Sequence, residues 1–286
     1  MNTHVRPQVK FVTVDGLKLR YVEAGRGHPL ILLHGASLGS SADVFLRNLQ
    51  PLAAQGCRPI AFDSPGFGLS DTPSDHSGGY RRDAILKFMD ALGIEKAALI
   101  GHSQSGGPAA QIGLQKPDRV THVIVLGTGS LLPPADDSMK TPGVTAQRQG
   151  GEPKAAEMKE PTLADTRQLL EWNLFHTELV TEDELALRHS RSLGACFRAH
   201  VARAALAERE PAKEPATPLW KRLVELKMPL RLMFGRQDRG WAHGRAMKLK
   251  ELYPQLDLHI LEDCKHLVPW DAAETWVKLA VEKLKA

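Results

Sequence analysis

The sequence predicts an α/β fold: a mostly parallel eight-stranded sheet with helices on both faces and a helical lid inserted into it. Short apolar segments alternate with segments of helical periodicity up to residue 126. Repeated strand–helix units of this kind build a parallel sheet that helices cover on both sides. The alternation stops near residue 130 and resumes after residue 226. We therefore expect a core of residues 1–129 and 226–286, with a helical lid insertion of residues 130–225.

The first half of the core opens with a hairpin, because the turn Asp15-Gly16 separates the strand-like segments Phe11–Val14 and Leu17–Val22. Four short strands follow, apolar enough to be buried on both faces of a parallel sheet. They are predicted at Leu30–Leu33, Arg58–Phe62, Lys96–Ile100 and Val120–Leu126. Helical spacing is found over residues 42–54, Tyr80–Leu92 and Pro108–Leu114.

The insertion differs from the core in composition. Residues 130–160 are rich in Pro, Gly, Lys and Glu and contain little to bury, and a similar stretch, Glu208–Pro218, closes the segment. Residues 163–208 between them have the amphipathic spacing of several helices. The core resumes with strands predicted at Leu230–Phe234 and Leu256–Leu261 and helices at Ala242–Leu252 and Ala272–Leu284.

Composition excludes several classes of protein. Lys plus Arg number 37 and Asp plus Glu 33, and the resulting charge of +4 is scattered, which indicates a solvated surface and no nucleic-acid partner. We expect no membrane association and a cytoplasmic location, because residues 1–8 lack an apolar leader and no apolar run approaches membrane-spanning length. The three cysteines are too far apart for a disulfide framework or a zinc site, and we expect no metal or cofactor. The sequence leaves open whether the chain forms a homo-oligomer.

A candidate nucleophile lies in the turn Gly101–Gly106, between an apolar strand and a helix. A serine at a tight strand-to-helix turn is lifted clear of the sheet, and the helix N-terminus favours negative charge there. Ser103 occupies that position. The usual Gly-x-Ser-x-Gly pattern has Ser105 in its last place, which is still a small residue. Ser103 could instead simply cap the helix, but the strand on one side and the helix on the other favour the nucleophile.

A serine nucleophile needs a base, and the base needs an orienting acid. In open parallel sheets such groups gather beyond the carboxyl ends of the strands. Asp238 follows the strand that ends at residue 234, and His266 follows the one that ends at residue 261. The chain order Ser103, Asp238, His266 is the order expected on such a sheet. We predict that these three residues form a catalytic triad.

Each of these positions has another possible role. Asp238 could cap the next helix or be a solvated loop acid. His266 is one of twelve histidines in the chain and could simply be a polar surface residue. Asp263 is a competing acid, but it shares a loop with His266 and would struggle to reach the far ring nitrogen. Asp63 also follows a strand, but it precedes the nucleophile in the sequence, on the side of the sheet whose loops usually form the wall of the pocket. Three positions at three matching strand ends favour the triad.

A tetrahedral intermediate needs two backbone donors for its oxyanion. The amide that follows the nucleophile, that of Gln104, is one candidate. The loop after the third strand would supply the other, and Ala36 is placed for that role. Ser37 or Ser40 could add a hydroxyl donor. His34, at the start of the same loop, is expected to tie the loop to a neighbouring backbone.

These motifs together resemble the α/β-hydrolase superfamily across nearly the whole chain. The resemblance is carried by Leu32–Gly35, Phe62–Ser70, Gly101–Gly106, Gly235–Asp238 and Cys264–His266. Within the superfamily the chain looks most like the meta-cleavage product hydrolases, on Asp63–Phe67, Leu126–Gly129 and Leu174–Arg188. Those enzymes hydrolyse a carbon–carbon bond in vinylogous 1,5-diketone acids from ring-opening dioxygenases. The resemblance implies aromatic compound degradation and a small-molecule substrate with an apolar group and a carboxylate.

The resemblance also implies substrate-binding residues. Arg188 matches a lid arginine that holds the substrate carboxylate, although an ion pair with Glu184, four residues earlier, is an alternative. His102 and Leu267 stand where the family often has Asn and Trp, and together with Ser37 they are expected to contact substrate. Because of these departures, a carboxylesterase or lactonase with the same triad is the alternative function. A hydrolase-like small-molecule receptor is the third, and it would turn over slowly.

Overall fold

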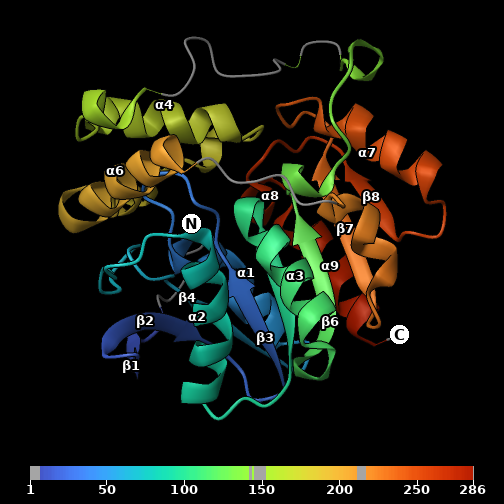
Figure 1. The fold of residues 1–286 in the computed structure, drawn as a ribbon, viewed down its shortest axis with the longest axis horizontal. Coiled ribbons are helices and arrows are strands. Elements are labelled where there is room, and N and C mark those ends of the chain that lie inside the picture. Colours follow the sequence, from blue (N-terminus) through green and yellow to red (C-terminus); the bar gives the residue numbers. More distant parts are fainter. Residues whose placement is uncertain (1–6, 142–143, 145–152, 211–216, 286) are drawn as a thin grey trace.

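An eight-stranded sheet forms the centre of the computed structural model, which describes residues 7–141, 144, 153–210 and 217–285 (Figure 1). The strand order is β1-β2-β4-β3-β5-β6-β7-β8. The strands are β1 (Lys10–Val14), β2 (Leu17–Glu23), β3 (His28–Leu33), β4 (Cys57–Phe62), β5 (Ala97–His102), β6 (Val120–Leu126), β7 (Leu230–Gly235) and β8 (Leu258–Leu261). Only β2 runs antiparallel to its neighbours, and the pairs from β4 to β8 are parallel. The predicted α/β fold with a mostly parallel eight-stranded sheet is confirmed.

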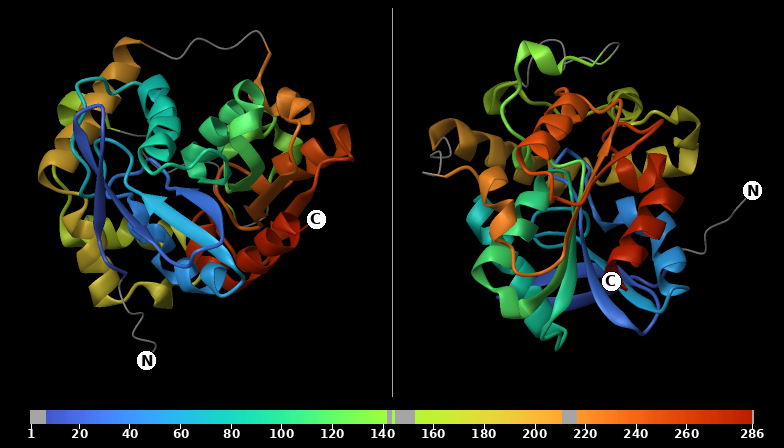
Figure 2. Two further views of the ribbon diagram at one scale, coloured as in Figure 1. Left: turned by 90° about the horizontal axis from the view of Figure 1, so that it is seen from below. Right: turned by 90° about the vertical axis from the view of Figure 1, so that its right-hand side faces the viewer.

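Helices cover both faces of the sheet, as the side view in Figure 2 shows. The core helices are α1 (Leu46–Ala53), α2 (Gly78–Ala91), α3 (Gly106–Gln115), α7 (Ala242–Leu252), α8 (Val268–Asp271) and α9 (Ala273–Leu284). Helices α2, α3 and α7 bury their apolar residues in one cluster, and α1 and α9 bury theirs in another on the opposite face.

The central strands are apolar along their whole length because both of their faces are covered. In β5, Ala97 and Leu99 belong to one cluster while Ala98 and Ile100 belong to the other, as the alternation of side chains along a strand requires. All four are fully buried. This accounts for the short uninterrupted apolar runs in the sequence.

In the described parts of the segment between β6 and β7, three α-helices lie across the carboxyl ends of the strands (Figure 1). They are α4 (Leu163–Asn173), α5 (Glu182–Ser190) and α6 (Gly194–Arg209). Helix α4 begins with a capping box, in which Thr162 and Asp165 bond each other's backbone amide. The polar stretches predicted at 130–160 and 208–218 lie partly outside the described residues.

The structure moves several predicted boundaries by one or two residues and divides one predicted helix. The helix predicted over 42–54 is divided into a single 3-10 turn, Ala42–Phe45, and helix α1. Strand β8 begins at residue 258 rather than 256. Leu256 is buried in the core from the turn before the strand, so its apolar side chain extended the predicted strand by two residues.

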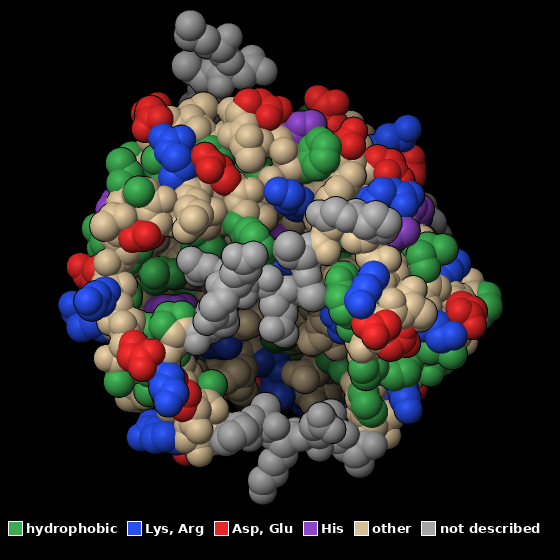
Figure 3. All heavy atoms as spheres, turned by 90° about the horizontal axis from the view of Figure 1, so that it is seen from above, with side chains coloured by type: hydrophobic (Ala, Val, Ile, Leu, Met, Phe, Trp, Pro, Cys, Tyr) green, Lys and Arg blue, Asp and Glu red, His purple; other side chains and the backbone are tan. Residues whose placement is uncertain are grey.

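The surface agrees with the scattered charge of the sequence. Basic and acidic side chains are interspersed on the face shown in Figure 3. Within the described parts of the chain, no helix is both long and apolar enough to cross a membrane.

Candidate active site

Ser103 sits on a strained turn between β5 and α3. Its φ angle is +56°, a left-handed conformation that non-glycine residues rarely adopt. The turn is tight on both sides. A Cβ on Gly101 would lie 2.5 Å from the carbonyl oxygen of Ser105, and one on Gly106 would lie 2.1 Å from Thr128 Oγ1. Only glycine fits at these two places, and the resulting bend aims the Ser103 side chain away from the sheet.

Ser105 takes the place where a glycine is usual. Its φ of −83° is an ordinary right-handed conformation, so glycine is not required there. Its hydroxyl donates a hydrogen bond to the carbonyl oxygen of His34. The exchange of glycine for serine therefore ties the turn to the loop after β3.

The structure brings Ser103, His266 and Asp238 together from the ends of three parallel strands. The Ser103 hydroxyl lies 2.8 Å from His266 Nε2, and His266 Nδ1 lies 3.0 Å from Asp238 Oδ2. Asp238 is 3% exposed. Asp63, another acid at a strand end, is not the partner of His266, since it forms an ion pair with Arg20. This geometry can remove the proton from a hydroxyl and stabilise the imidazolium that results.

The loop after β3 passes directly beside the nucleophile. A Cβ on Gly35 would lie 2.9 Å from Ser103 Cβ. The loop is fixed by His34, whose Nε2 accepts a hydrogen bond from the Ser64 amide while Nδ1 donates to the carbonyl oxygen of Gly35. Burial lowers the pKa of His34 to about 3, so the ring is neutral at physiological pH. The predicted structural role of His34 is confirmed.

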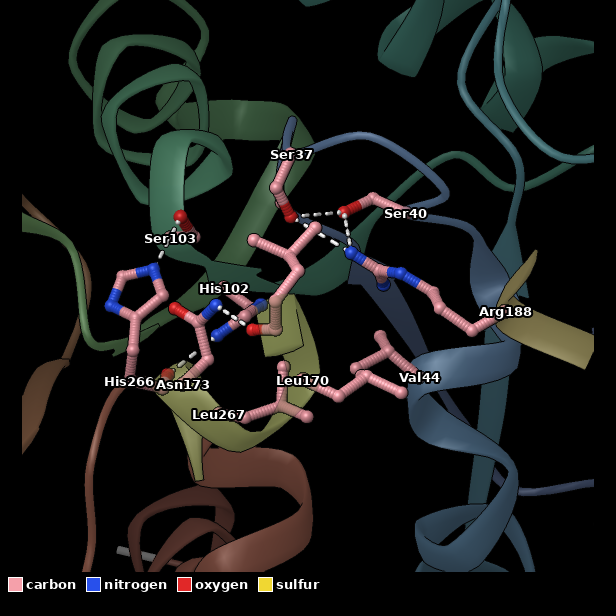
Figure 4. Close-up of a pocket in the computed structure, with 12 residues that line it drawn as sticks. Ser37, Ser40, Val44, His102, Ser103, Leu170, Asn173, Arg188, His266 and Leu267 are labelled. Atoms are coloured by element: carbon pink, nitrogen blue, oxygen red, sulfur yellow. Dashed lines mark hydrogen bonds between the residues drawn. The ribbon is translucent and has the colours of Figure 1, made fainter. Parts of the chain in front are cut away.

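A cavity of about 10 Å³ lies against Ser103 and His266 (Figure 4). Of the predicted substrate-binding residues, Ser37, His102, Arg188 and Leu267 all line it. The predicted oxyanion residues, Ala36 and Gln104, are not among its described lining residues, and Gln104 faces a second cavity instead. A space of this volume holds about one water molecule, so a substrate must displace side chains to enter.

Arg188 carries a positive charge that no carboxylate in the described chain neutralises by direct contact. Its guanidinium donates to Ser37 Oγ at 2.9 Å and Ser40 Oγ at 3.3 Å, while its Nε has no partner among the described residues (Figure 4). Glu184, the alternative partner, pairs with Arg47 at 3.4 Å. Burial lowers the pKa of Arg188 to about 10, which still leaves it protonated at neutral pH. The cavity therefore suits an anionic group.

His102, which lines the same cavity, has a buried ring nitrogen without a hydrogen-bond partner among the described residues. Its Nε2 lies 2.8 Å from the carbonyl oxygen of His266. A carbonyl only accepts, so Nε2 carries the proton. Burial, followed by the charge of His266, lowers the pKa of His102 to about 3. The ring is therefore neutral, and Nδ1 holds a buried lone pair with no partner among the described residues.

Asn173 was missed by sequence reasoning. It ends α4 and lines the cavity, and its backbone carbonyl accepts a hydrogen bond of 2.9 Å from the Leu267 amide. Its side chain donates to the carbonyl oxygen of Leu169 and accepts from Arg239. The signal available in the sequence is weak: a polar residue at a buried position of an amphipathic helix.

A buried group of charges anchors the insertion to the core. Arg20 bonds both Asp43 and Asp63, and Arg191, just after α5, reaches Asp43 at 3.0 Å. Although burial alone would raise the pKa of Asp43, Arg20 and Arg191 lower it. Asp63 also accepts the Ala42 amide at 2.6 Å. The 3-10 turn at 42–45, which follows the loop beside Ser103, is thereby held in place.

Within the described residues, no three His, Cys, Asp or Glu side chains gather in a way that could hold a metal ion. The site as described consists of hydroxyl, imidazole, carboxylate and guanidinium groups. These groups can provide a base-activated nucleophile beside a guanidinium that is suited to an anion.

Known proteins share this arrangement of elements. Residues 28–273 match the sequence profile of the α/β hydrolase fold family. A 2-hydroxy-6-oxo-6-phenylhexa-2,4-dienoate hydrolase from Burkholderia cepacia is 30% identical over 96% of both chains. A 2-hydroxy-6-oxononadienedioate/2-hydroxy-6-oxononatrienedioate hydrolase from Burkholderia vietnamiensis is 31% identical over 96% of this chain and 95% of its own. The solved structure of a meta-cleavage product hydrolase from Pseudomonas fluorescens IP01 superposes with a TM-score of 0.74, at 25% identity over 98% of both chains.

Proposed function

This chain belongs to the α/β-hydrolase fold family, and from that premise we propose that it hydrolyses a carbon–carbon bond in a vinylogous diketone acid from aromatic ring cleavage. The observation that carries the proposal is the shared cavity: the hydrogen-bonded Ser103, His266 and Asp238 stand beside Arg188, which no described carboxylate contacts directly. The relatives that are about 30% identical over nearly the whole chain cleave substrates of this class.

In the proposed mechanism, Ser103 is the nucleophile and His266 is the base that receives its proton. Asp238 holds the imidazole in the required tautomer. The amides of Gln104 and Ala36 stabilise the oxyanion. Residues 130–225 act as the lid, whose helices α4 and α5 contribute Asn173 and Arg188 to the cavity.

Arg188 binds the carboxylate of the substrate, because guanidinium geometry matches a carboxylate in a bidentate pair. Its present partners, Ser37 and Ser40, are hydroxyls and carry no charge to compete with an incoming anion. The enol hydroxyl is the one hydroxyl group that the substrate anion can use as a hydrogen-bond donor. We propose that it donates a hydrogen bond to the unprotonated Nδ1 of His102. Leu267, Leu170 and Val44 supply the apolar wall.

The bond cleavage balances with one water molecule. The enol first becomes a ketone by moving its proton to C5, for which His266 is the proposed carrier. Ser103 Oγ attacks the C6 carbonyl and gives its proton to His266. The C5–C6 bond then breaks, and its electron pair is delocalised into the 2-oxo group, which takes that proton and becomes the dienol product. Water hydrolyses the resulting acyl ester of Ser103: its hydroxyl ends on C6 as a carboxylic acid, and its proton restores the Ser103 hydroxyl.

We propose a cytoplasmic location and a small-molecule substrate as the binding partner. The three cysteines, Cys57, Cys196 and Cys264, are all unpaired, which is usual for a protein of a reducing compartment.

The test is a side-by-side assay of a 2-hydroxy-6-oxo-dienoate and a 4-nitrophenyl ester, with Ser103→Ala as control. We expect steady turnover of the dienoate, followed by loss of its ultraviolet absorbance, and no turnover by the variant. Turnover of the ester alone would assign the chain to the carboxylesterases. A single burst without steady turnover would indicate a receptor.

A further inference from the structure

The loop that carries His266 is held by its backbone amides on both sides of the histidine. On one side, the Leu267 amide donates a hydrogen bond of 2.9 Å to the carbonyl oxygen of Asn173, the last residue of α4 (Figure 4). On the other side, the Lys265 amide donates to Asp271 Oδ2 at 2.8 Å. The position of His266 therefore depends on Asn173 in α4 and on Asp271 at the end of α8.

Asp271 also binds the chain that leaves α4. Its Oδ1 accepts the amides of Phe175 at 3.1 Å and His176 at 3.0 Å, and its Oδ2 accepts the Phe175 amide as well, at 3.0 Å. The carboxylate thus accepts hydrogen bonds from two amides of the insertion and from the Lys265 amide, next to His266. Such bonds to a charged acceptor are stronger than bonds between neutral groups. The end of α4 and the His266 loop are therefore joined through one side chain.

The loop that carries Asp238 belongs to the same hydrogen-bonded unit. Gln237 donates its amide to the carbonyl oxygen of Cys264 at 3.0 Å, and its Oε1 accepts the Cys264 amide, also at 3.0 Å. Arg239, on the other side of Asp238, donates to the Asn173 side chain. The loops of the acid and of the base are thus bonded to each other and to the end of α4.

Helix α4 also forms part of the wall of the cavity at Ser103, to which it contributes Leu169, Leu170 and Asn173. The cavity has room for about one water molecule, so an entering substrate has to displace lining residues. Because the end of this helix is bonded to the His266 loop through Asp271, a displacement of α4 is transmitted to the base.

We propose that Asp271 is a positioning residue, which places His266 against Ser103 when the end of α4 is closed over the cavity. The proposal rests on the proposed function, in which residues 130–225 act as a lid and His266 is the base. Asp271 is not among the described lining residues of the cavity, so it acts through the His266 loop and not on the substrate. An open lid then leaves the nucleophile without its base, which restricts the reaction to enclosed substrates.

Asp271→Asn tests the role of the carboxylate, because an amide side chain accepts hydrogen bonds on one atom only. Whichever way the side chain is turned, its NH₂ group faces backbone amides that also donate, and the link on that side is lost. We expect kcat for a dienoate to fall about 10- to 100-fold per folded molecule, since a misplacement of about 1 Å costs up to about 100-fold. KM should stay within about threefold, because Arg188 is held separately by Ser37 and Ser40.

Two further variants are controls for this one. Asp271→Glu keeps both accepting oxygens and should recover part of the lost kcat. Glu274→Gln removes an exposed acid in the first turn of α9 and should change neither constant by more than about threefold. Urea unfolding gives the folded fraction of each variant, so that a loss of stability is separated from a loss of rate.

The link to the insertion is tested at His176, whose φ of −87° is near the value that proline takes. His176→Pro removes one amide donor to Asp271 and leaves the His266 loop unaltered. His176→Ala is the matched control, since it removes the ring but keeps the N–H group. We expect kcat to fall in the proline variant alone. Equal rates in the two variants would overturn the coupling to α4.

Labelling of Ser103 by a small fluorophosphonate reports on the base without a dienoate. The reagent forms a bond between Ser103 Oγ and phosphorus and releases fluoride, and the Ser103 proton goes to His266. We expect Asp271→Asn to slow labelling by a factor similar to its loss of kcat, and Ser103→Ala to show no labelling. Mass spectrometry of the intact protein follows the reaction.

A raised KM with unchanged kcat, or labelling of Asp271→Asn at or above the wild-type rate, would overturn the proposal, because Asp271 would then only hold the helix in place. If wild type is labelled but cleaves no dienoate, the proposed substrate fails. The labelling rates of the Asp271 and His176 variants still decide the positioning role in that case.

Discussion

The two hydrogen bonds of His266 determine which of its nitrogens can act as a base. A carboxylate only accepts hydrogen bonds, so Asp238 requires the proton to be on Nδ1. Nε2 is then left with a lone pair, 2.8 Å from the Ser103 hydroxyl. The direction of proton transfer follows from this single contact.

Replacing Asp238 with Asn should reverse that tautomer, because the amide can donate to Nδ1. We expect kcat to fall by about 10⁴-fold with little change in fold. Asp263→Asn is the matched control, since Asp263 shares the His266 loop, and it should retain activity within about threefold. Steady-state kinetics and circular dichroism of both variants check this, and equal losses in the two variants would contradict the assignment of the acid.

Replacing Arg188 with Gln should weaken binding of anionic substrates specifically. We expect KM for a dienoate to rise about 10- to 100-fold, because a charge-assisted hydrogen bond is lost. An uncharged 4-nitrophenyl ester measured on the same preparations should keep its KM. An unchanged KM for the dienoate would remove Arg188 from the binding site.

At the scale of elements, the elbow turn depends on contacts between neighbouring segments. Helix α3 starts against the chain that follows β6, and Gly106 is the point of contact with Thr128. Gly35 is packed in the same way against Ser103. The position of the nucleophile is therefore set by the absence of side chains around it.

Gly106→Ala should disturb this packing, because the new Cβ would lie 2.1 Å from Thr128 Oγ1. We expect a loss of about 1–3 kcal/mol in the free energy of unfolding, together with a lower kcat. Adding Thr128→Ala should recover part of the stability, because it removes Oγ1 while the Cβ at 2.8 Å remains, as a double-mutant cycle in urea unfolding will show. Additive losses would mean that the two residues do not interact.

The sequence was sufficient to predict the main strands and helices and the meeting of Ser103, Asp238 and His266, since strand ends of a parallel sheet meet at one edge. It was insufficient where the answer depends on how the insertion packs. The sequence leaves open whether Arg188 pairs with Glu184, whereas in the structure the Glu184 carboxylate pairs with Arg47. Asn173 has no motif, and the free nitrogen of His102 depends on a carbonyl 164 residues away. Such contacts join residues far apart in the sequence, so local sequence patterns cannot predict them.

At the scale of the whole molecule, the fold buries two neutral histidines next to its reacting groups. His34 is 1% exposed and His102 is 3% exposed. Burial lowers the pKa of each to about 3, whereas an unfolded histidine has a pKa of about 6.5. Between these values the unfolded chain binds more protons than the native one, so stability falls as the pH decreases below about 6.5.

We therefore expect the free energy of unfolding to fall between pH 7.5 and pH 5, with each of these histidines contributing about 2 kcal/mol to the loss. His102→Asn should reduce the difference between the two pH values by about that amount. Urea unfolding of wild type and variant at both pH values measures it. An identical pH dependence in the two proteins would show that His102 is not buried as a neutral ring.

The positive φ of Ser103 limits which other nucleophiles this site can accept. A side chain branched at Cβ is strongly disfavoured in a left-handed turn, so threonine is a poorer substitute for serine here than its shared hydroxyl suggests. Cysteine is unbranched, and aspartate tolerates the conformation well. New reactivity at this position would thus be reached through a thiolate or a carboxylate, and backbone geometry rather than chemical likeness decides which exchange is conservative.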